Sequence, residues 1–289
     1  MIPFLKLIRY KNLLMVLLTM VLTKYAFIHS FVEKSNLSDL EFSLLALSVL
    51  LITAGGYIIN DIFDIEADKI NKPTRVFVDV TIAKKKATYI YLLLSLIGLI
   101  IGVFLSFSKG YHINSLIFVF TFLGLIFYSK NLKKVPLIGN FIVSVFISLV
   151  ILLVFLFEKG STKSISIWAA IDSIFSSITL LYFLSFYLIF SFLITLIREI
   201  IKDIEDIDGD KVLNINTLPI VLGRKRSKSI VLILVVILII LVIIWSINLF
   251  QINLINFFKY ITILITLPLF YFFYLLWIAK TKKEYSVLS

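Results

Sequence analysis

Two short stretches of this sequence gather acidic side chains at a spacing that could bind a cation. The first follows an uncharged apolar segment, residues 42–59. On a helix that turns about 100° per residue, one amide and three carboxylates of this stretch fall within an arc of about 100°. These residues are Asn60, Asp61, Asp64 and Asp68. Glu66 projects from another face of the predicted helix.

The second stretch, residues 198–219, repeats the arrangement further along the chain. Four of its carboxylates fall within an arc of about 60° on a helix. They are Glu199, Asp203, Asp206 and Asp210. Glu205 and Asp208 project elsewhere. Gly209 is a candidate end for this helix, which bears on the placement of Asp210.

Carboxylates at this density favour a bound metal ion. Like charges on one face of a helix repel one another, and a charged side chain at the centre of a membrane helix costs about 2.5–3.5 kcal/mol. A multivalent cation between two such faces would relieve both costs. Oxygen ligands suit Mg²⁺, which usually keeps some waters and is completed by phosphate oxygens of a substrate. A solvated charged loop is the alternative for either stretch alone.

Basic residues accompany both stretches. Lys72 and Arg75 follow the first, and Lys202 lies within the second. A further segment, residues 128–140, adds Lys130, Lys133 and Lys134. Arg binds phosphate oxygens through a fork of donors, and Lys binds them as a point charge. A phosphate-bearing substrate therefore fits the charge pattern.

The elements that must position these residues are membrane helices. The chain has 289 residues, of which 61% are hydrophobic and 16% charged, and its mean hydropathy is +1.08. A run of about 20 apolar residues spans a bilayer as a helix. Eight such runs occur, near residues 12–32, 42–63, 87–107, 112–129, 137–157, 175–200, 229–249 and 257–279. We predict an all-α, polytopic transmembrane helical bundle. Its first run lacks a small-residue cleavage site and is taken as a membrane helix rather than a signal peptide.

The distribution of basic residues predicts the orientation. With eight spans and an inside N-terminus, 22 of the 28 Lys and Arg residues lie in inside segments. The six exceptions are Lys24, Lys34, Lys109, Lys159, Lys163 and Lys259. Positive charge of this kind marks the cytoplasmic side of a membrane protein. We therefore expect a cytoplasmic N-terminus and cytoplasmic acidic stretches, in the plasma membrane if the source is prokaryotic. The net charge of +11 then reports topology rather than a nucleic-acid partner.

The acidic stretches resemble the two signatures of the UbiA superfamily of intramembrane prenyltransferases. The signature N-D-x-x-D-x-x-x-D is matched by Asn60, Asp61, Asp64 and Asp68. The signature D-x-x-x-D is matched by Asp206 and Asp210, with Asp203 before them. The stretch Asn216–Gly223 downstream is also similar, and the resemblance covers nearly the whole chain.

The resemblance implies a ring of helices around a central cavity and Mg²⁺-dependent transfer of a polyprenyl group from its diphosphate to a lipophilic acceptor. Residues 198–211 and 128–140 are most similar to the branch that prenylates geranylgeranylglyceryl phosphate, with geranylgeranyl as the expected group. An aromatic acceptor, such as a hydroxybenzoate, a quinone precursor, a haem or a chlorin, is the alternative. The chain is expected to form one domain, residues 1–289, without the last of the family's usual nine helices.

The resemblance also implies roles for individual residues. The catalytic carboxylates, which hold Mg²⁺, are Asp64, Asp68, Asp206 and Asp210. Asn60 and Asp203 complete the expected metal ligands. The expected substrate-binding residues are Asn60, Asp61, Lys72, Arg75, Tyr128, Lys133, Lys134, Asn140, Lys202 and Asp203. Tyr57 and Tyr128 are the aromatic residues nearest the acidic stretches that could face a developing carbocation.

Two other interpretations of the sequence remain open. Gly55 and Gly56, just before the first stretch, favour close helix–helix contact, with a cavity wall as the alternative. An ion-coupled transporter also carries acids within a helical bundle. Transporters more often place such acids near the bilayer midplane on helices broken by Gly or Pro. Here the acids lie at predicted helix ends, and only Pro268 lies deep in a span.

Overall fold

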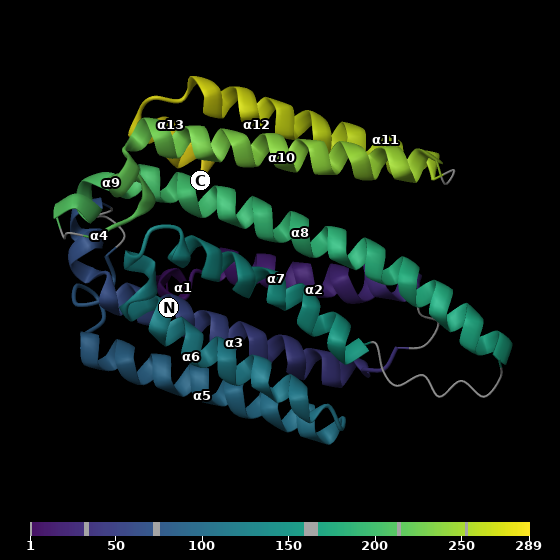
Figure 1. Ribbon diagram of the computed structural model, residues 1–289. Helices are drawn as coiled ribbons and strands as arrows, with labels where there is room; N and C mark the ends of the chain where they lie inside the picture. Colours follow the sequence, from purple (N-terminus) through teal and green to yellow (C-terminus); the bar gives the residue numbers. More distant parts are fainter. Residues whose placement is uncertain (1, 32–34, 72–75, 159–166, 213–214, 252–253) are drawn as a thin grey trace. The chain divides into compact units, whose positions relative to one another are not determined.

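The computed structural model describes residues 2–31, 35–71, 76–158, 167–212, 215–251 and 254–289 (Figure 1). These residues form helices joined by short connections, with one isolated bridge between Val78 and Ile82. The prediction of an all-α protein is confirmed.

The helices alternate with short connections along the chain. The first part contains α1 (Ile2–Leu7), α2 (Tyr10–Val21), α3 (Asp39–Phe63), α4 (Ile65–Asn71), α5 (Lys84–Ser108), α6 (Ser115–Lys130) and α7 (Ile138–Glu158). The second part contains α8 (Ile167–Val212), α9 (Leu218–Leu222), α10 (Arg224–Gln251), α11 (Ile255–Ile261), α12 (Leu267–Ile278) and α13 (Lys282–Leu288). Two π-helical segments, Leu22–Phe27 and Thr262–Thr266, extend α2 and join α11 to α12.

Eight helical segments of the described chain are long and apolar enough to cross a membrane, and each matches one of the eight predicted runs. They are Tyr10–Ser30, Asp39–Phe63, Lys84–Ser108, His112–Lys130, Ile138–Glu158, Leu180–Val212, Arg224–Gln251 and Ile255–Ile278. Large apolar side chains such as Met15 and Phe104 are well exposed on these helices. Such exposure is expected for side chains that contact lipid rather than water.

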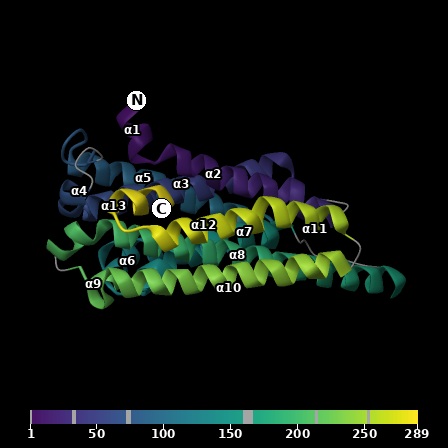
Figure 2. The same ribbon diagram turned by 90° about the horizontal axis from the view of Figure 1, so that it is seen from above.

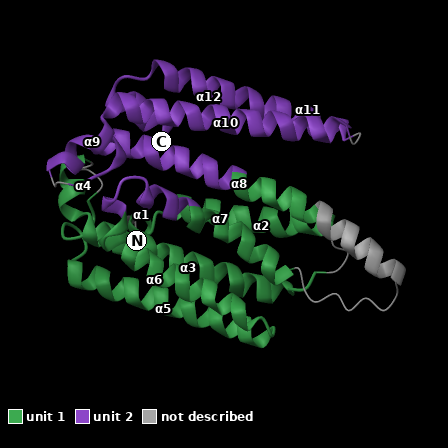
Figure 3. Cartoon of the chain, viewed as in Figure 1, with its two compact units in different colours: residues 1–132, 145–189 green, residues 133–144, 190–289 purple. Residues whose placement is uncertain are grey.

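The chain forms two compact units, coloured in Figure 3. Unit 1 comprises residues 1–132 and 145–189, and unit 2 comprises residues 133–144 and 190–289. The first acidic stretch belongs to unit 1 and the second to unit 2. The expectation of a single domain stays a prediction.

In unit 1, small residues allow α3 to pack closely along α5 and α6. The Ser48 hydroxyl on α3 donates a hydrogen bond of 2.6 Å to the Gly98 carbonyl on α5. A Cβ atom on Gly98 would lie 2.9 Å from the Ser48 carbonyl oxygen. A Cβ atom on Gly55 would meet the Ser95 hydroxyl, and one on Gly56 would lie 3.0 Å from the Leu125 side chain. The expected helix–helix contact at both α3 glycines is confirmed.

Replacement of Gly98 by Leu is expected to lower the free energy of unfolding by about 1–3 kcal/mol, because the backbone of α3 leaves no room for a side chain. Thermal unfolding in detergent would measure this loss. Ile100→Leu, at an exposed position of the same helix, is the control and should change the melting temperature little. An equal melting temperature for Gly98→Leu and wild type would contradict the close approach of α3 and α5.

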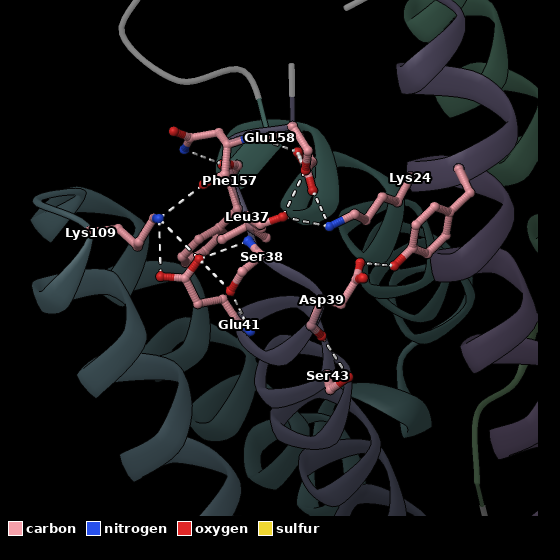
Figure 4. A network of polar contacts seen from close by, with 12 residues as sticks. Lys24, Leu37, Ser38, Asp39, Glu41, Ser43, Lys109, Phe157 and Glu158 are labelled. Atoms are coloured by element: carbon pink, nitrogen blue, oxygen red, sulfur yellow. Dashed lines mark hydrogen bonds and ion pairs between the residues drawn. The ribbon is translucent and has the colours of Figure 1, made fainter. Parts of the chain in front are cut away.

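A polar network joins several connections at the end of unit 1 where α3 begins (Figure 4). Lys24 and Glu158 form an ion pair of 2.9 Å, with side chains that are 0% and 1% exposed. Lys109 pairs with Glu41 at 3.1 Å. Glu41 also forms a capping box with Ser38 at the start of α3, so this end of unit 1 is fixed by side-chain contacts.

In unit 2, α10 and the segment α11–α12 run side by side, as Figures 1 and 2 both show. Pro268 lies in the first turn of α12, directly after the π-helical segment. Proline lacks the N–H of a regular helical hydrogen bond, which explains a local change of helix geometry there. Lys228 of α10 donates hydrogen bonds of 2.6 and 2.8 Å to the carbonyls of Trp277 and Ala279. This lysine thereby satisfies carbonyls at the end of α12.

Candidate functional site

The first acidic stretch lies where α3 gives way to α4. The sequence predicts one continuous helix through this stretch, and this prediction is wrong: α3 ends at Phe63 and α4 begins at Ile65. Asp64, between them, has φ −99° and ψ 4°. The helical hydrogen-bond register nevertheless persists, because Asp64 N donates to the Asn60 carbonyl (2.9 Å) and Asp68 N to the Asp64 carbonyl (2.8 Å). The break is thus confined to one residue.

Within this stretch, Asn60 and Asp64 lie together. The Asn60 amide nitrogen donates a hydrogen bond of 2.7 Å to a carboxylate oxygen of Asp64. The Asn60 amide oxygen, Oδ1, is buried and has no hydrogen-bond partner in the described part of the chain. Asp68 is half-buried, whereas Glu66 is exposed and pairs with Lys69 at 2.7 Å. The face assigned to Glu66 from the sequence agrees with this arrangement.

Asp61 has a partner that the sequence did not indicate. Nη2 of Arg9, in the connection between α1 and α2, donates a hydrogen bond of 2.8 Å to Oδ1 of Asp61. The Arg9 guanidinium carbon lies 4.9 Å from the centre of the Tyr57 ring. Burial lowers the pKa of Arg9, but the negative charge of Asp61 and its hydrogen bond to Arg9 outweigh this effect, so that the pKa lies above its ordinary value. Arg9 is therefore a fixed cation beside the first stretch.

Three other predicted site residues are Lys72, Arg75 and Tyr128. Lys72 and Arg75 lie outside the described residues. Tyr128 is half-buried in the last turn of α6, in unit 1. Their expected roles stay predictions.

The second acidic stretch lies in the last turns of α8, in unit 2. Gly209 does not end this helix, which continues to Val212, so the expected helix end is corrected. Gly209 is buried within the helix and does not take the positive φ of a helix-ending glycine. Gly223, with φ 85°, takes that role after α9 instead. Asp210 therefore remains on the same helix as Asp203 and Asp206.

The carboxylates of this stretch are held by neighbours within unit 2. Asn140 of α7 donates a hydrogen bond of 2.8 Å to Asp203, which links the two predicted site residues. The Thr217 hydroxyl donates to Asp210 at 3.3 Å. Thr217 was not singled out from the sequence, although it lies in the stretch Asn216–Gly223. Asp206 is half-buried, Asp208 is exposed and Glu205 is buried.

Basic residues of unit 2 lie on α8 and in the turn before α7. Glu199 is buried and pairs with Arg198 at 2.9 Å and with Lys202 at 3.5 Å. Lys133 and Lys134 lie in the 3₁₀ turn Leu132–Lys134 before α7, and Lys134 is exposed. Lys202 is therefore engaged with an acid of its own helix.

The chemistry of the donor groups fits Mg²⁺. Carboxylate and amide oxygens are hard ligands of the kind that Mg²⁺ binds, and Oδ1 of Asn60 is an oxygen without a hydrogen-bond partner in the described chain. The described residues contain no group of three or more acidic or histidine side chains close enough to hold a metal ion by themselves. Magnesium held here would thus depend on oxygens from other sources, such as the phosphate groups of a substrate or water.

Known proteins resemble this chain along most of its length. The model of the UbiA prenyltransferase family matches residues 13–288. The chain is 37% identical over 191 residues to digeranylgeranylglyceryl phosphate synthase of Saccharolobus solfataricus, a match that covers 66% of this chain and 60% of that protein. It is 32% identical over 232 residues to the enzyme of the same name in Methanosphaera stadtmanae, covering 80% of this chain and 73% of that protein.

A solved structure shares the fold. The chain resembles a UbiA homolog from Archaeoglobus fulgidus bound to GPP and Mg²⁺, with a TM-score of 0.68 and 15% identity over 99% of this chain and 94% of that one. The match to the Saccharolobus protein spans less than two thirds of that relative. The family model, however, covers nearly the whole chain and confirms the resemblance that the acidic stretches indicated. With eight apolar helices in the described part of its sequence, this chain is an integral membrane protein that belongs to the UbiA prenyltransferase family.

Proposed function

We propose that this protein transfers a geranylgeranyl group from its diphosphate to geranylgeranylglyceryl phosphate in a Mg²⁺-dependent reaction. The names of the two curated relatives support the acceptor. The observation that carries the proposal is the pairing of Asn60 with Asp64 at the end of α3, which leaves a buried amide oxygen for a cation. Family membership supplies the reaction class.

The proposal assigns metal-binding side chains to both acidic stretches. The residues that would hold magnesium are Asn60, Asp64, Asp68, Asp203, Asp206 and Asp210. Magnesium bound to the diphosphate would stabilise the negative charge that develops on this leaving group. Asn60 and Asn140 position the carboxylates through their hydrogen bonds to Asp64 and Asp203. The Mg²⁺ bound in the Archaeoglobus homolog supports the choice of metal.

Basic and aromatic residues complete the proposed site. Those assigned to the phosphate groups are Lys72, Arg75, Lys133, Lys134 and Lys202. Their donors would stabilise the leaving diphosphate electrostatically, as preorganised cations do. Tyr128 would face the allylic carbon, where the ring can stabilise developing positive charge.

The proposed orientation places the N-terminus and the acidic stretches in the cytoplasm. The bias of Lys and Arg toward alternate connections supports it. Two of the six exceptions, Lys24 and Lys109, pair with Glu158 and Glu41, so their charges are compensated. Both soluble substrate headgroups would then reach the site from the cytoplasm, where the lipid tails can lie in the bilayer.

Prenyl transfer by the purified protein in liposomes tests the proposal. The assay uses geranylgeranyl diphosphate with geranylgeranylglyceryl phosphate, 4-hydroxybenzoate or haem as acceptor, with Mg²⁺ or with a chelator. We expect product with the glycerophosphate acceptor in Mg²⁺ only. If product forms only with an aromatic acceptor, the proposed acceptor is wrong and the proposed prenyl transfer is kept. No product with any acceptor, from protein with a native melting temperature, would reject the proposed activity.

A further inference from the structure

One arginine beside the first acidic stretch has no part in the site proposed above. Arg9 joins α1 to α2 and bonds to Asp61, the neighbour of Asn60. Its guanidinium also lies over the Tyr57 ring, one turn earlier on α3. A cation in contact with two residues so close to the expected metal ligands can act on a substrate as well as on the fold.

The Arg9 guanidinium is held by Asp61 through one N–H donor and by the Tyr57 ring on one face. Its other N–H donors remain available. Its side chain is 34% exposed, whereas that of Asp61 is 13% exposed. Arg carries five N–H donors, and Asp61 is the only hydrogen-bond partner of this side chain in the described part of the protein. Because Asp61 and Tyr57 already restrict its rotamers, little further ordering is needed when an anion binds.

The backbone of Arg9 points to a role beyond helix capping. Arg9 is the N-cap of α2, with φ 51° and ψ 54°, in the left-handed region that non-glycine residues rarely adopt. Its carbonyl accepts hydrogen bonds from Asn12 N (2.8 Å) and Leu13 N (3.2 Å). Its side chain makes no capping hydrogen bond, and Ser, Thr, Asp or Asn would cap better. An arginine at this position raises the conformational energy of the backbone and does not cap the helix. Backbone strain of this kind clusters at functional sites.

Phosphate is the anion that matches this guanidinium. Arginine binds phosphate oxygens by two parallel N–H donors, whereas lysine acts as a point charge. The negative charge of Asp61 does not repel a phosphate strongly, because Arg9 compensates it. The Arg9–Asp61 pair is therefore neutral overall before the substrate binds. Magnesium on the neighbouring ligands would bring the phosphate oxygens to the same end of α3.

We propose that Arg9 is a substrate-binding residue that contacts a phosphate group, held in place by Asp61 and Tyr57. This inference rests on the proposed function, in which both substrates carry phosphate: the prenyl donor as a diphosphate and the acceptor as a monoester. A salt bridge that only ties α1 and α2 to α3 is the structural alternative, and it would affect stability without affecting the binding of either substrate.

Steady-state kinetics of Arg9→Met and Arg9→Lys in liposomes test the proposal. We expect Arg9→Met to raise the KM of one phosphate-bearing substrate by about 10- to 100-fold, the range for a lost charge-assisted hydrogen bond. Arg9→Lys should recover part of that loss. The substrate whose KM rises identifies the source of the phosphate. The control Lys11→Met removes an exposed cation two residues away and should leave both KM values within about twofold.

Two outcomes would overturn the proposal. One is Arg9→Met with both KM values within threefold of wild type. The other is a melting temperature that falls in Arg9→Met while kcat falls and both KM values hold, which is the result expected for the structural alternative.

A binding measurement keeps this inference separate from the proposed function. If wild-type protein forms no product, the proposed function fails, and Arg9 is judged by thermal stabilisation in Mg²⁺ with inorganic pyrophosphate or glycerol 1-phosphate. We expect one of these probes to stabilise wild type and Lys11→Met, and to stabilise Arg9→Met less. Equal stabilisation of wild type and Arg9→Met by both probes would reject a phosphate contact.

Discussion

Replacement of Asp64 by Asn is expected to lower the rate of prenyl transfer by about 10²- to 10³-fold, the range for removal of one preorganised electrostatic group from an active site. The asparagine carbonyl can still accept the hydrogen bond from Asn60. The change therefore removes one negative charge and leaves the local structure intact. Assays in liposomes at saturating Mg²⁺ and donor measure the effect, and the melting temperature should change by only a few degrees.

Asp206→Asn is expected to have an effect of similar size, although Asp206 lies in the other unit. If both acidic stretches serve one reaction, the double variant should be at most about tenfold slower than either single variant. Residues that act as a unit show such non-additive losses. Multiplication of the two single losses would show that the stretches act independently.

Exposed carboxylates of the same stretches provide matched controls. Glu66 pairs with Lys69 on the surface of α4, and Asp208 is exposed on α8. Glu66→Gln and Asp208→Asn remove the same charge as the test variants and should keep activity within about twofold. Loss of activity in a control, or full activity in Asp64→Asn, would contradict the assignment of the carboxylates from their helical faces.

The properties that follow from local sequence were predictable. The apolar runs predicted the eight spans because a helix in lipid needs about 20 apolar residues, a condition that few other structures meet. The 100° spacing placed Asn60 beside Asp64 and separated Glu66 from them, as the hydrogen bonds confirm. The predictions of two helix boundaries were wrong because the residue types near them are weak indicators of where a helix ends. Gly209 is accommodated inside α8, and α3 breaks at Asp64 without a glycine or proline.

Contacts between residues far apart in sequence could not be predicted. Arg9 lies 52 residues from Asp61, and no pattern in either segment indicates the other. The same holds for Lys24, which the sequence marks only as an exception to the inside bias of positive charge. Its partner, Glu158, lies at the end of another helix. Pairs of this kind depend on the packing of whole helices, which a single sequence does not specify.

Replacement of Glu158 by Gln is expected to lower the free energy of unfolding by about 3–5 kcal/mol, because it leaves the charge of Lys24 buried without a counter-charge. The Lys24 ammonium also donates a hydrogen bond of 2.8 Å to the Leu37 carbonyl and lies 4.8 Å from the centre of the Phe42 ring. These contacts compensate the cation only in part. A loss of this size corresponds to a fall of about 10 °C in melting temperature, which thermal unfolding in detergent would record.

The loss of stability on replacement of Glu158 is larger than the loss of its contact with Lys24 alone would cause, because the Glu158 carboxylate also binds the connection before α3. One carboxylate oxygen accepts hydrogen bonds from the Ser35 hydroxyl (2.8 Å) and the Asn36 backbone N–H (3.1 Å). A glutamine amide nitrogen cannot accept either bond. Its carbonyl can serve Lys24 or this pair of donors, so one set is left unsatisfied.

Two variants separate the buried charge from ordinary surface electrostatics. Lys109→Met breaks the pair with Glu41, whose side chains are 19% and 31% exposed, and should cost about 1 kcal/mol or less. The double variant Lys24→Met/Glu158→Leu should be more stable than Glu158→Gln, because an apolar pair avoids the desolvation of an unpaired charge. If Glu158→Gln and Lys109→Met cost the same, burial does not strengthen the Lys24–Glu158 pair, and desolvation of Lys24 does not control the stability of this end of unit 1.

The same pair separates stability from catalysis. Lys24 lies fifteen residues after Arg9 on a helix that rises about 1.5 Å per residue, so the ion pair is about 20 Å along this helix from the first acidic stretch. Glu158→Gln that remains folded at low temperature should therefore keep its kcat and both KM values. A change of either KM at a temperature where the variant is fully folded would mean that this end of unit 1 also determines the geometry of the acidic stretch.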